Sequence, residues 1–178
     1  DAVYIVSVLV LGQEEHCSEE MKQQISIARH LGVSVFWDNL TGETTFTETS
    51  FSEYSIIVDA IFGIGLSRDV TGVIADYINA INRSAADVLA VDIPSGISAD
   101  TGAVLGTAVK ATITVTFGHN KRGLVLYPGT EYAGQVVVTD IGFPEMVTER
   151  VMKQSQTFTY TKEDISVYFP NRKKRSNK

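Results

Sequence analysis

The stretch Val88-Leu89-Ala90-Val91-Asp92-Ile93-Pro94-Ser95-Gly96 decides the fold that we predict for this chain. Its apolar half indicates a short buried strand, and Pro94, which cannot donate to a sheet ladder, places the strand's end near Ile93. Asp92 therefore stands at the carboxyl end of a central strand, where open α/β sheets bind ligands. An aspartate that only caps the turn explains the same residues equally well.

Two further predicted strands also end in polar residues. Residues 54–62 form an apolar run with Asp59 near its end, followed by the glycine-containing loop Gly63–Asp69. Glycines let the backbone approach a ligand, and amides before a helix favour an anion, although a plain strand-to-helix turn shows the same pattern. Lys121 follows the strand predicted at residues 109–117. It is a candidate for phosphate contact or acid–base chemistry, or else an ordinary surface lysine.

The rest of the chain predicts an α/β fold. Residues 3–11 and 33–37 are apolar strands on either side of a helix that Ser18 can cap, and such a βαβ unit implies parallel pairing. Residues 41–52 are rich in threonine and glutamate and predict an exposed connection with room for a short edge strand. A helix with one apolar face and a final strand are predicted at residues 73–81 and 135–141. Continuous apolar strands are usually covered on both faces.

Composition excludes several classes of protein. The 178 residues carry a net charge of −6, which argues against a general nucleic-acid binder. No apolar run reaches membrane-spanning length. A single cysteine, Cys17, rules out an internal disulfide framework and favours a reducing, cytoplasmic compartment. The histidines lack metal-ligand spacing, so we do not expect zinc.

Carboxylate and hydroxyl oxygens at Asp59, Asp92 and Ser95 suit a hard cation or a general base. These observations indicate an α/β enzyme for a phosphorylated small molecule.

Several motifs in order extend this interpretation: Asp59–Arg68 (DAIFGIGLSR), Val91–Gly96 (VDIPSG), Asp100–Gly102 (DTG), Thr114–Phe117 (TVTF) with Lys121, and Gly134–Pro144 (GQVVVTDIGFP). With these, the chain resembles the NAD(P)H-hydrate epimerase family over most of residues 1 to 144. The resemblance implies a Rossmann-like three-layer sandwich with a mostly parallel central sheet. It also implies interconversion of the R and S forms of NADHX and NADPHX, which are nicotinamide cofactors hydrated at ring carbon 6. A bound potassium ion and a homodimer or larger homo-oligomer are further implications.

Residue roles follow from the same resemblance. Asp59 and Ser95 would be potassium ligands. Asp92 would contact the damaged ring and assist loss and return of its hydroxyl group, with Lys121 stabilising phosphate or exchanging a proton. The loop expected to hold the phosphates through backbone amides comprises Gly63, Ile64, Gly65, Leu66, Ser67, Arg68 and Asp69.

The resemblance also has a gap. The family's Gly-Asn-Asn-Gly-Gly-Asp loop, which precedes the strand matched by residues 3–11, has no counterpart here. We expect residues 1–150 to form an epimerase-like domain without its N-terminal part. Residues 151–178 would be a linker toward a dehydratase domain that uses ADP or ATP. Residues 1–178 alone should leave an open strand edge, be less soluble than a longer chain and bind hydrate poorly. The alternatives are a non-catalytic nucleotide-binding or scaffold protein on the same fold, or another phosphometabolite enzyme.

Overall fold

The computed structural model describes residues 4–42, 46–154, 157–160 and 164–165. The chain divides into two compact units, Asp1–Ile141 and Gly142–Lys178. The second unit contains helix α5 (Glu145–Gln154), which we did not predict from the sequence. This helix runs across the domain boundary expected at residue 150. None of the described helices is long and apolar enough to cross a membrane.

The first unit begins with the predicted βαβ motif. It comprises β1 (Ser7–Leu11), the short helix η1 (Glu14–His16), α1 (Glu19–His30) and β2 (Ser34–Asp38). The strands pair in parallel from Ser7 opposite Ser34 to Leu11 opposite Asp38, which confirms the prediction. Ser18 caps α1 by accepting a hydrogen bond from the Met21 N–H at 3.2 Å. β1 is shorter than expected, because Tyr4, Ile5 and Val6 are exposed and lie outside the strand.

The connection at residues 41–52 differs from its prediction. It contains a short helix, α2 (Glu48–Ser52), and no edge strand among its described residues; residues 43–45 lie outside the description. The Thr47 N–H donates to the Ser50 hydroxyl at 3.4 Å, a capping interaction that starts the helix. Phe51 then enters the hydrophobic core and is 8% exposed. Phe46 of the same segment packs against that core as well, and the threonine-rich composition gave no indication of either contact.

A four-stranded parallel sheet forms the body of the first unit, in the order β3-β4-β5-β6. Its strands are β3 (Ile56–Asp59), β4 (Asp87–Val91), β5 (Ile113–Phe117) and β6 (Gln135–Thr139), and the remaining elements are α3 (Gly72–Arg83), α4 (Arg122–Val125) and η2 (Gly129–Glu131). The predicted α/β class with parallel pairing is confirmed. However, β5 is shorter than residues 109–117, and the described strands form two sheets where one central sheet was expected.

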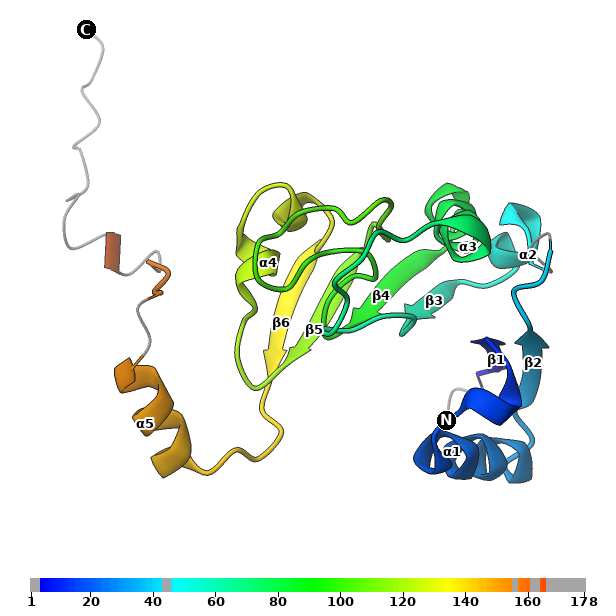
Figure 1. The fold of residues 1–178 in the computed structure, drawn as a ribbon, viewed down its shortest axis with the longest axis horizontal. Coiled ribbons are helices and arrows are strands. Elements are labelled where there is room, and N and C mark those ends of the chain that lie inside the picture. Colours follow the sequence, from blue (N-terminus) through cyan, green and yellow to red (C-terminus); the bar gives the residue numbers. More distant parts are fainter. Residues whose placement is uncertain (1–3, 43–45, 155–156, 161–163, 166–178) are drawn as a thin grey trace, which may run out of the picture. The chain divides into compact units, whose positions relative to one another are not determined.

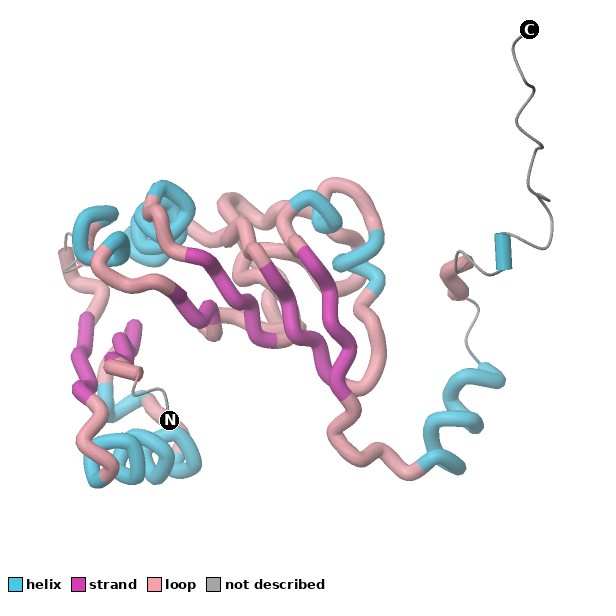
Figure 2. The backbone as a smooth tube through the Cα atoms, turned by 180° about the vertical axis from the view of Figure 1, so that it is seen from behind, coloured by secondary structure: helices cyan, strands magenta, loops and turns pink. Residues whose placement is uncertain are grey.

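Helices α2, α3 and α4 lie on the same face of the four-stranded sheet (Figures 1 and 2). On that face Tyr77, Ile78 and Ile81 of α3 are buried with Val88 of β4, as the helical spacing predicted. The opposite face is open at β3, where the alternate residues Ile56 and Val58 are 57% and 60% exposed. A parallel sheet normally has helices on both faces. The expected second layer is not among the described elements of this unit.

The two sheets contact each other through side chains. Within the described part of the chain, β1 pairs only with β2, and β3 pairs only with β4, so each has one edge without a strand partner. Leu9 and Leu11 of β1 pack against the core cluster that includes Tyr77. The Tyr77 hydroxyl donates a short hydrogen bond to the carboxylate of Asp38, which is 7% exposed at the end of β2.

Candidate active site

Three neighbouring strands of the four-stranded sheet end in polar side chains at one edge. β3 ends at Asp59, β4 is followed by Asp92, and β5 is followed by the turn that leads to Lys121. All three strands run in the same direction, so their carboxyl ends lie together. The structure thereby brings together Asp59 with Ser95, and Asp92 with Lys121. It does so through direct contacts within each pair.

Asp59 and Ser95 form a buried pair. Asp59 is 2% exposed and Ser95 1%. The Ser95 hydroxyl donates to Asp59 Oδ1 at 2.6 Å, and the Ser95 N–H donates to Asp59 Oδ2 at 2.8 Å. The same hydroxyl accepts a hydrogen bond from the Phe62 N–H at 2.8 Å and lies 3.3 Å from the Phe62 carbonyl oxygen. Its single proton goes to the carboxylate, which is the nearer and charged acceptor.

Burial sets the electrostatics of this pair. It raises the pKa of Asp59 above its ordinary value, against the opposing effect of hydrogen bonds from Ser95 and Ile61. No ion pair to Asp59 occurs among the described residues. The described part of the chain also has no group of three or more His, Cys, Asp or Glu side chains placed to hold a metal ion. A cation here would therefore be bound by one carboxylate together with hydroxyl and main-chain oxygens.

The backbone between the two pairs is tightly constrained. Asp92 has φ 69°, and the Ile93 N–H donates to the Val91 carbonyl at 2.9 Å, so Asp92 is the central residue of a strained three-residue turn. Gly96 has φ 97°, and a Cβ there would lie 2.0 Å from the Thr107 carbonyl oxygen. Only glycine fits that position. Strain of this kind costs about 1–3 kcal/mol per residue and is concentrated at functional sites.

Asp92 and Lys121 form an ion pair, with Lys121 Nζ 2.6 Å from Asp92 Oδ1. Both side chains are 19% exposed. The same carboxylate oxygen accepts hydrogen bonds from the Thr116 hydroxyl at 3.1 Å and from the Phe117 N–H at 3.2 Å. Lys121 is held in turn by the Phe117 carbonyl at 2.8 Å. Every contact to the Asp92 carboxylate falls on Oδ1, so Oδ2 has no partner among the described residues.

These contacts determine the charge of Asp92. Partial burial alone would raise the pKa of its carboxyl group, but the hydrogen bonds from Lys121, Phe117 and Thr116, together with the Lys121 charge, lower it below the ordinary value. Asp92 is therefore ionised at neutral pH. An ionised carboxylate at the carboxyl edge of the sheet can accept a proton or stabilise a developing positive charge.

The predicted phosphate loop, residues 63–69, leaves β3 beside this edge. Most of its residues are exposed, and a Cβ added at Gly63 or Gly65 would meet nothing within 4 Å. Protein packing therefore does not require these glycines, and the loop backbone is open to a ligand. The next helix, α3, starts at Gly72, close to the start predicted at residue 73 and shortly after the loop ends at Asp69.

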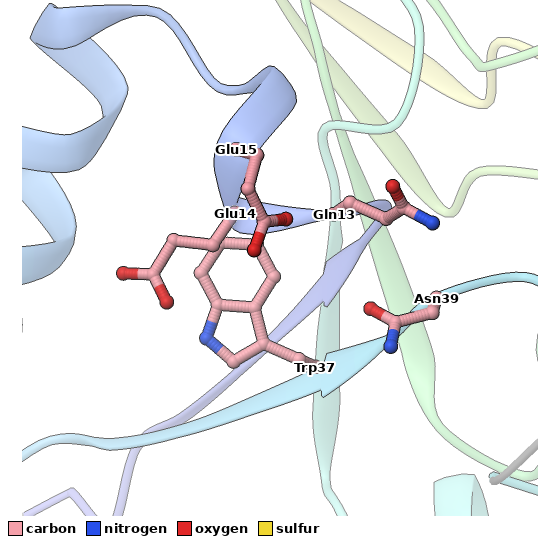
Figure 3. Close-up of a pocket in the computed structure, with 5 residues that line it drawn as sticks. All are labelled: Gln13, Glu14, Glu15, Trp37 and Asn39. Carbon is pink, nitrogen blue, oxygen red and sulfur yellow. The ribbon is translucent and has the colours of Figure 1, made fainter.

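Sequence reasoning missed several residues at the strand ends. Thr116 is fully buried and bonded to Asp92; the alternation of threonine with apolar residues along its strand was the available signal. Asp38 and Tyr77 had no sequence signal that linked them. The carboxyl ends of β1 and β2 also form a pocket beside Trp37 (Figure 3).

Comparison with known proteins gives consistent results. Residues 2–123 match the family described as YjeF-related protein N-terminus. The chain is 46% identical to the NAD(P)H-hydrate epimerase of Oenococcus oeni over 140 residues (79% of this chain, 62% of the relative) and 44% identical to that of Levilactobacillus brevis over 137 residues (77% and 60%). The bifunctional NAD(P)H-hydrate repair enzyme Nnr of Thermofilum pendens is 49% identical over 98 residues (55% and 19%).

A solved structure shares the fold. The crystal structure of yeast ynu0 superposes with a TM-score of 0.66 at 17% identity, covering 90% of this chain and 64% of that one. At this identity the similarity shows the fold alone. The chain spans about three fifths of the length of the two bacterial epimerases that it matches.

Proposed function

Because the chain belongs to the YjeF-related protein N-terminus family, we propose that it acts in NAD(P)H-hydrate epimerisation, the interconversion of the R and S forms of NADHX and NADPHX. The names of its bacterial relatives support this substrate. The observation that carries the proposal is the Asp92–Lys121 ion pair, 2.6 Å long, at the carboxyl edge of the sheet. The other oxygen of that carboxylate, Oδ2, has no partner among the described residues, and the exposed glycine loop follows Asp59 at the same edge.

The reaction requires inversion at one carbon. In the hydrate, ring carbon 6 carries a hydroxyl group next to the ring nitrogen. Protonation of that hydroxyl and cleavage of the C–O bond release water and leave a planar, positively charged ring. Water then adds to the opposite face and gives up a proton. One proton is taken up and one is released, so no other reactant is needed.

Asp92 and Lys121 suit these two proton transfers. The ionised Asp92 carboxylate attracts the positive ring and can accept the proton of the incoming water through Oδ2. Lys121, bonded to Oδ1 of the same carboxylate, is a cationic donor that can return a proton to the leaving hydroxyl. The Phe117 carbonyl and amide hold both partners in place. We assign the loop Gly63–Asp69 to the phosphates of the hydrate, since its backbone is exposed.

Asp59 and Ser95 fit a monovalent cation. Their oxygens, with the Phe62 carbonyl near the Ser95 hydroxyl, provide hard ligands around a buried carboxylate, and burial raises the pKa of that carboxyl group. We propose that potassium binds here. When bound, it would neutralise Asp59 and lower the charge repulsion between Asp59, Asp92 and the substrate phosphates.

We extend the proposal to the whole protein in three respects. We expect a homodimer or larger homo-oligomer, as the resemblance implies, and a cytoplasmic location, as the single cysteine indicates. The bifunctional name of the Thermofilum pendens relative supports a dehydratase domain beyond residue 150. Light scattering, cell fractionation and an ADP- or ATP-dependent dehydration assay, respectively, test these three points.

The decisive experiment follows R-to-S exchange of NADPHX by NMR. We expect this chain, in the protein that carries it, to speed the exchange above the spontaneous rate. Hydrate binding without faster exchange would contradict the epimerase proposal. It would indicate instead a non-catalytic nucleotide-binding protein on the same fold.

A further inference from the structure

Helix α4, which directly follows Lys121, packs backbone against backbone on the loop that follows β4. Its Gly123 donates the main-chain N–H to the Ala99 carbonyl oxygen at 2.7 Å. A Cβ at position 123 would lie 2.1 Å from the Ser98 carbonyl oxygen and 3.0 Å from the Ala99 Cα. No larger residue fits there unless one of the two segments moves. The close approach of the two backbones therefore requires glycine at this position.

This contact is supported from two further directions. A Cβ at Gly129 would lie 2.1 Å from the Gly123 carbonyl oxygen, so the segment after α4 also lies close against the helix. The neighbouring Leu124 is 2% exposed and packs in a core cluster with Ile93 and Ile97 of the loop after β4. Helix α4 is therefore held by a glycine contact and by a buried side chain.

The loop that receives α4 is the one that carries Asp92. Its backbone is closed on itself, because the Leu105 N–H donates to the Gly96 carbonyl at 2.8 Å and the Ser98 N–H donates to the Ala103 carbonyl at 2.9 Å. These bonds connect the residues that α4 contacts with the turn that holds Asp92. The loop thus links the two partners of the ion pair through its own main chain.

Lys121 approaches Asp92 from the other side of this contact. Its carbonyl accepts the Leu124 N–H at 3.1 Å, so its backbone is part of the start of α4. The ammonium group, 2.6 Å from Asp92 Oδ1, lies at the end of a flexible four-carbon chain. Because that chain is flexible, the position of the Lys121 backbone decides how often the ammonium group meets the carboxylate.

We propose that Gly123 is a positioning residue for this ion pair, because its backbone contact with Ser98 and Ala99 sets the distance between Lys121 and Asp92. Gly123 acts through Lys121 and does not itself touch the substrate. Its effect on the reaction rests on the proposed function, whereas its effect on the ion pair does not. A displacement of about 1 Å at a reacting group can cost about 100-fold in rate.

Gly123→Ala in the full chain tests the proposal. Carboxyl ¹³C NMR follows the pKa of Asp92, with its resonance assigned by its loss in Asp92→Asn. We expect this pKa to rise toward its value in Lys121→Met, since the added methyl group moves the ammonium group away. NADPHX exchange should slow by up to about 100-fold. Adding Gly123→Ala to Lys121→Met should not raise the pKa further, because the ion pair is already lost.

A second crowded glycine supplies the matched control. A Cβ at Gly134 would lie 2.3 Å from the Thr112 carbonyl oxygen, and this residue precedes the amino end of β6, away from the strand ends that carry the site. Gly134→Ala should lower the melting temperature without changing the pKa of Asp92. If Gly123→Ala does not fold, Leu124→Val removes one methylene group from the packing of α4 and should raise the pKa slightly. Its control, Ile78→Val in the α3 cluster, should not.

Three results would overturn the assignment. The first is an unchanged pKa of Asp92 in folded Gly123→Ala or, where that variant does not fold, in Leu124→Val. The second is an equal rise in the matched control, and the third is a further rise in the double variant. A rise as expected in a protein that does not speed NADPHX exchange is a different result. It would contradict the proposed function and leave the positioning role of Gly123 standing.

Discussion

Asp59 and Asp92 lie at the carboxyl ends of neighbouring strands of the same sheet, yet their environments are opposite. Asp59 is 2% exposed and bonded to Ser95, and burial raises its pKa. The side chain of Asp92 is 19% exposed, and Lys121 and two further donors lower its pKa despite partial burial. Two carboxylates whose pKa values are driven apart usually have different roles. The comparison supports our proposal that Asp59 binds a cation and that Asp92 takes part in the chemistry.

The largest expected effect is on the chemistry of Asp92. Asp92→Asn removes the charge and basicity, and asparagine tolerates the left-handed backbone at φ 69°. Loss of an acid–base group usually costs about 10²–10⁴ in rate. We expect that loss in NADPHX exchange, with a nearly unchanged melting temperature. Asp100→Asn, at an exposed aspartate, is the control. Full activity of Asp92→Asn would contradict an acid–base role for Asp92.

Asp59 should show the opposite pattern, a loss of stability. Asp59→Ala leaves the buried Ser95 N–H and hydroxyl without their acceptor. Each unsatisfied buried group costs about 1–3 kcal/mol, so we expect the free energy of unfolding to fall by about 2–4 kcal/mol. Urea titration measures it, with the exposed Asp76→Ala of α3 as the matched control. If both variants lose equally little, the buried pair has no structural role.

Removing the Lys121 partner should raise the pKa of Asp92 and so bring it closer to that of Asp59. In Lys121→Met, a charge-assisted hydrogen bond of about 1.5–3 kcal/mol is lost. The pKa of Asp92 should therefore rise, and exchange at neutral pH should slow roughly 10- to 100-fold. Carboxyl ¹³C NMR follows the pKa directly. Lys22, paired with Glu19 at 2.8 Å on the surface, supplies the control Lys22→Met; exposed pairs contribute little.

Potassium should stabilise the wild-type chain through Asp59 and leave Asp92 unaffected. A ligand at a hundred times its Kd adds about 2.7 kcal/mol, and subsaturating potassium adds less. We expect a melting temperature about 2–6 °C higher in potassium than in a bulky organic cation. Asp59→Asn should abolish the difference and Asp92→Asn should keep it. An identical response of all three proteins would count against the cation site.

The sequence revealed more about strands than about contacts between them. Apolar runs ending in Asp59, in Asp92 and near Lys121, together with a βαβ pattern, were enough to predict that these residues share one edge. Their pairing was not predictable, because Lys121 reaches Asp92 only through the turn after β5 and its bond to the Phe117 carbonyl. Helix α2 and the Trp37 pocket depend on long-range packing, which composition does not encode.

The smallest expected effect is at Thr116, the buried donor that supports Asp92. Thr116→Val removes one of the bonds that lower the pKa of Asp92, so that pKa should rise slightly. Because we propose that the ionised form of Asp92 is active, the acid limb of the pH–rate profile should move to higher pH while the plateau changes less than about tenfold. Thr116→Ser, which keeps the hydroxyl, should restore the limb. The free energy of unfolding gives an independent test. A carboxyl group whose pKa is lower in the folded state stabilises the fold at pH values above its unfolded-state pKa. This contribution is lost as the pH falls through its folded-state pKa. The stability advantage of wild type over Thr116→Val should therefore shrink in acid. An advantage that grows in acid would show that Thr116 does not act through the charge of Asp92.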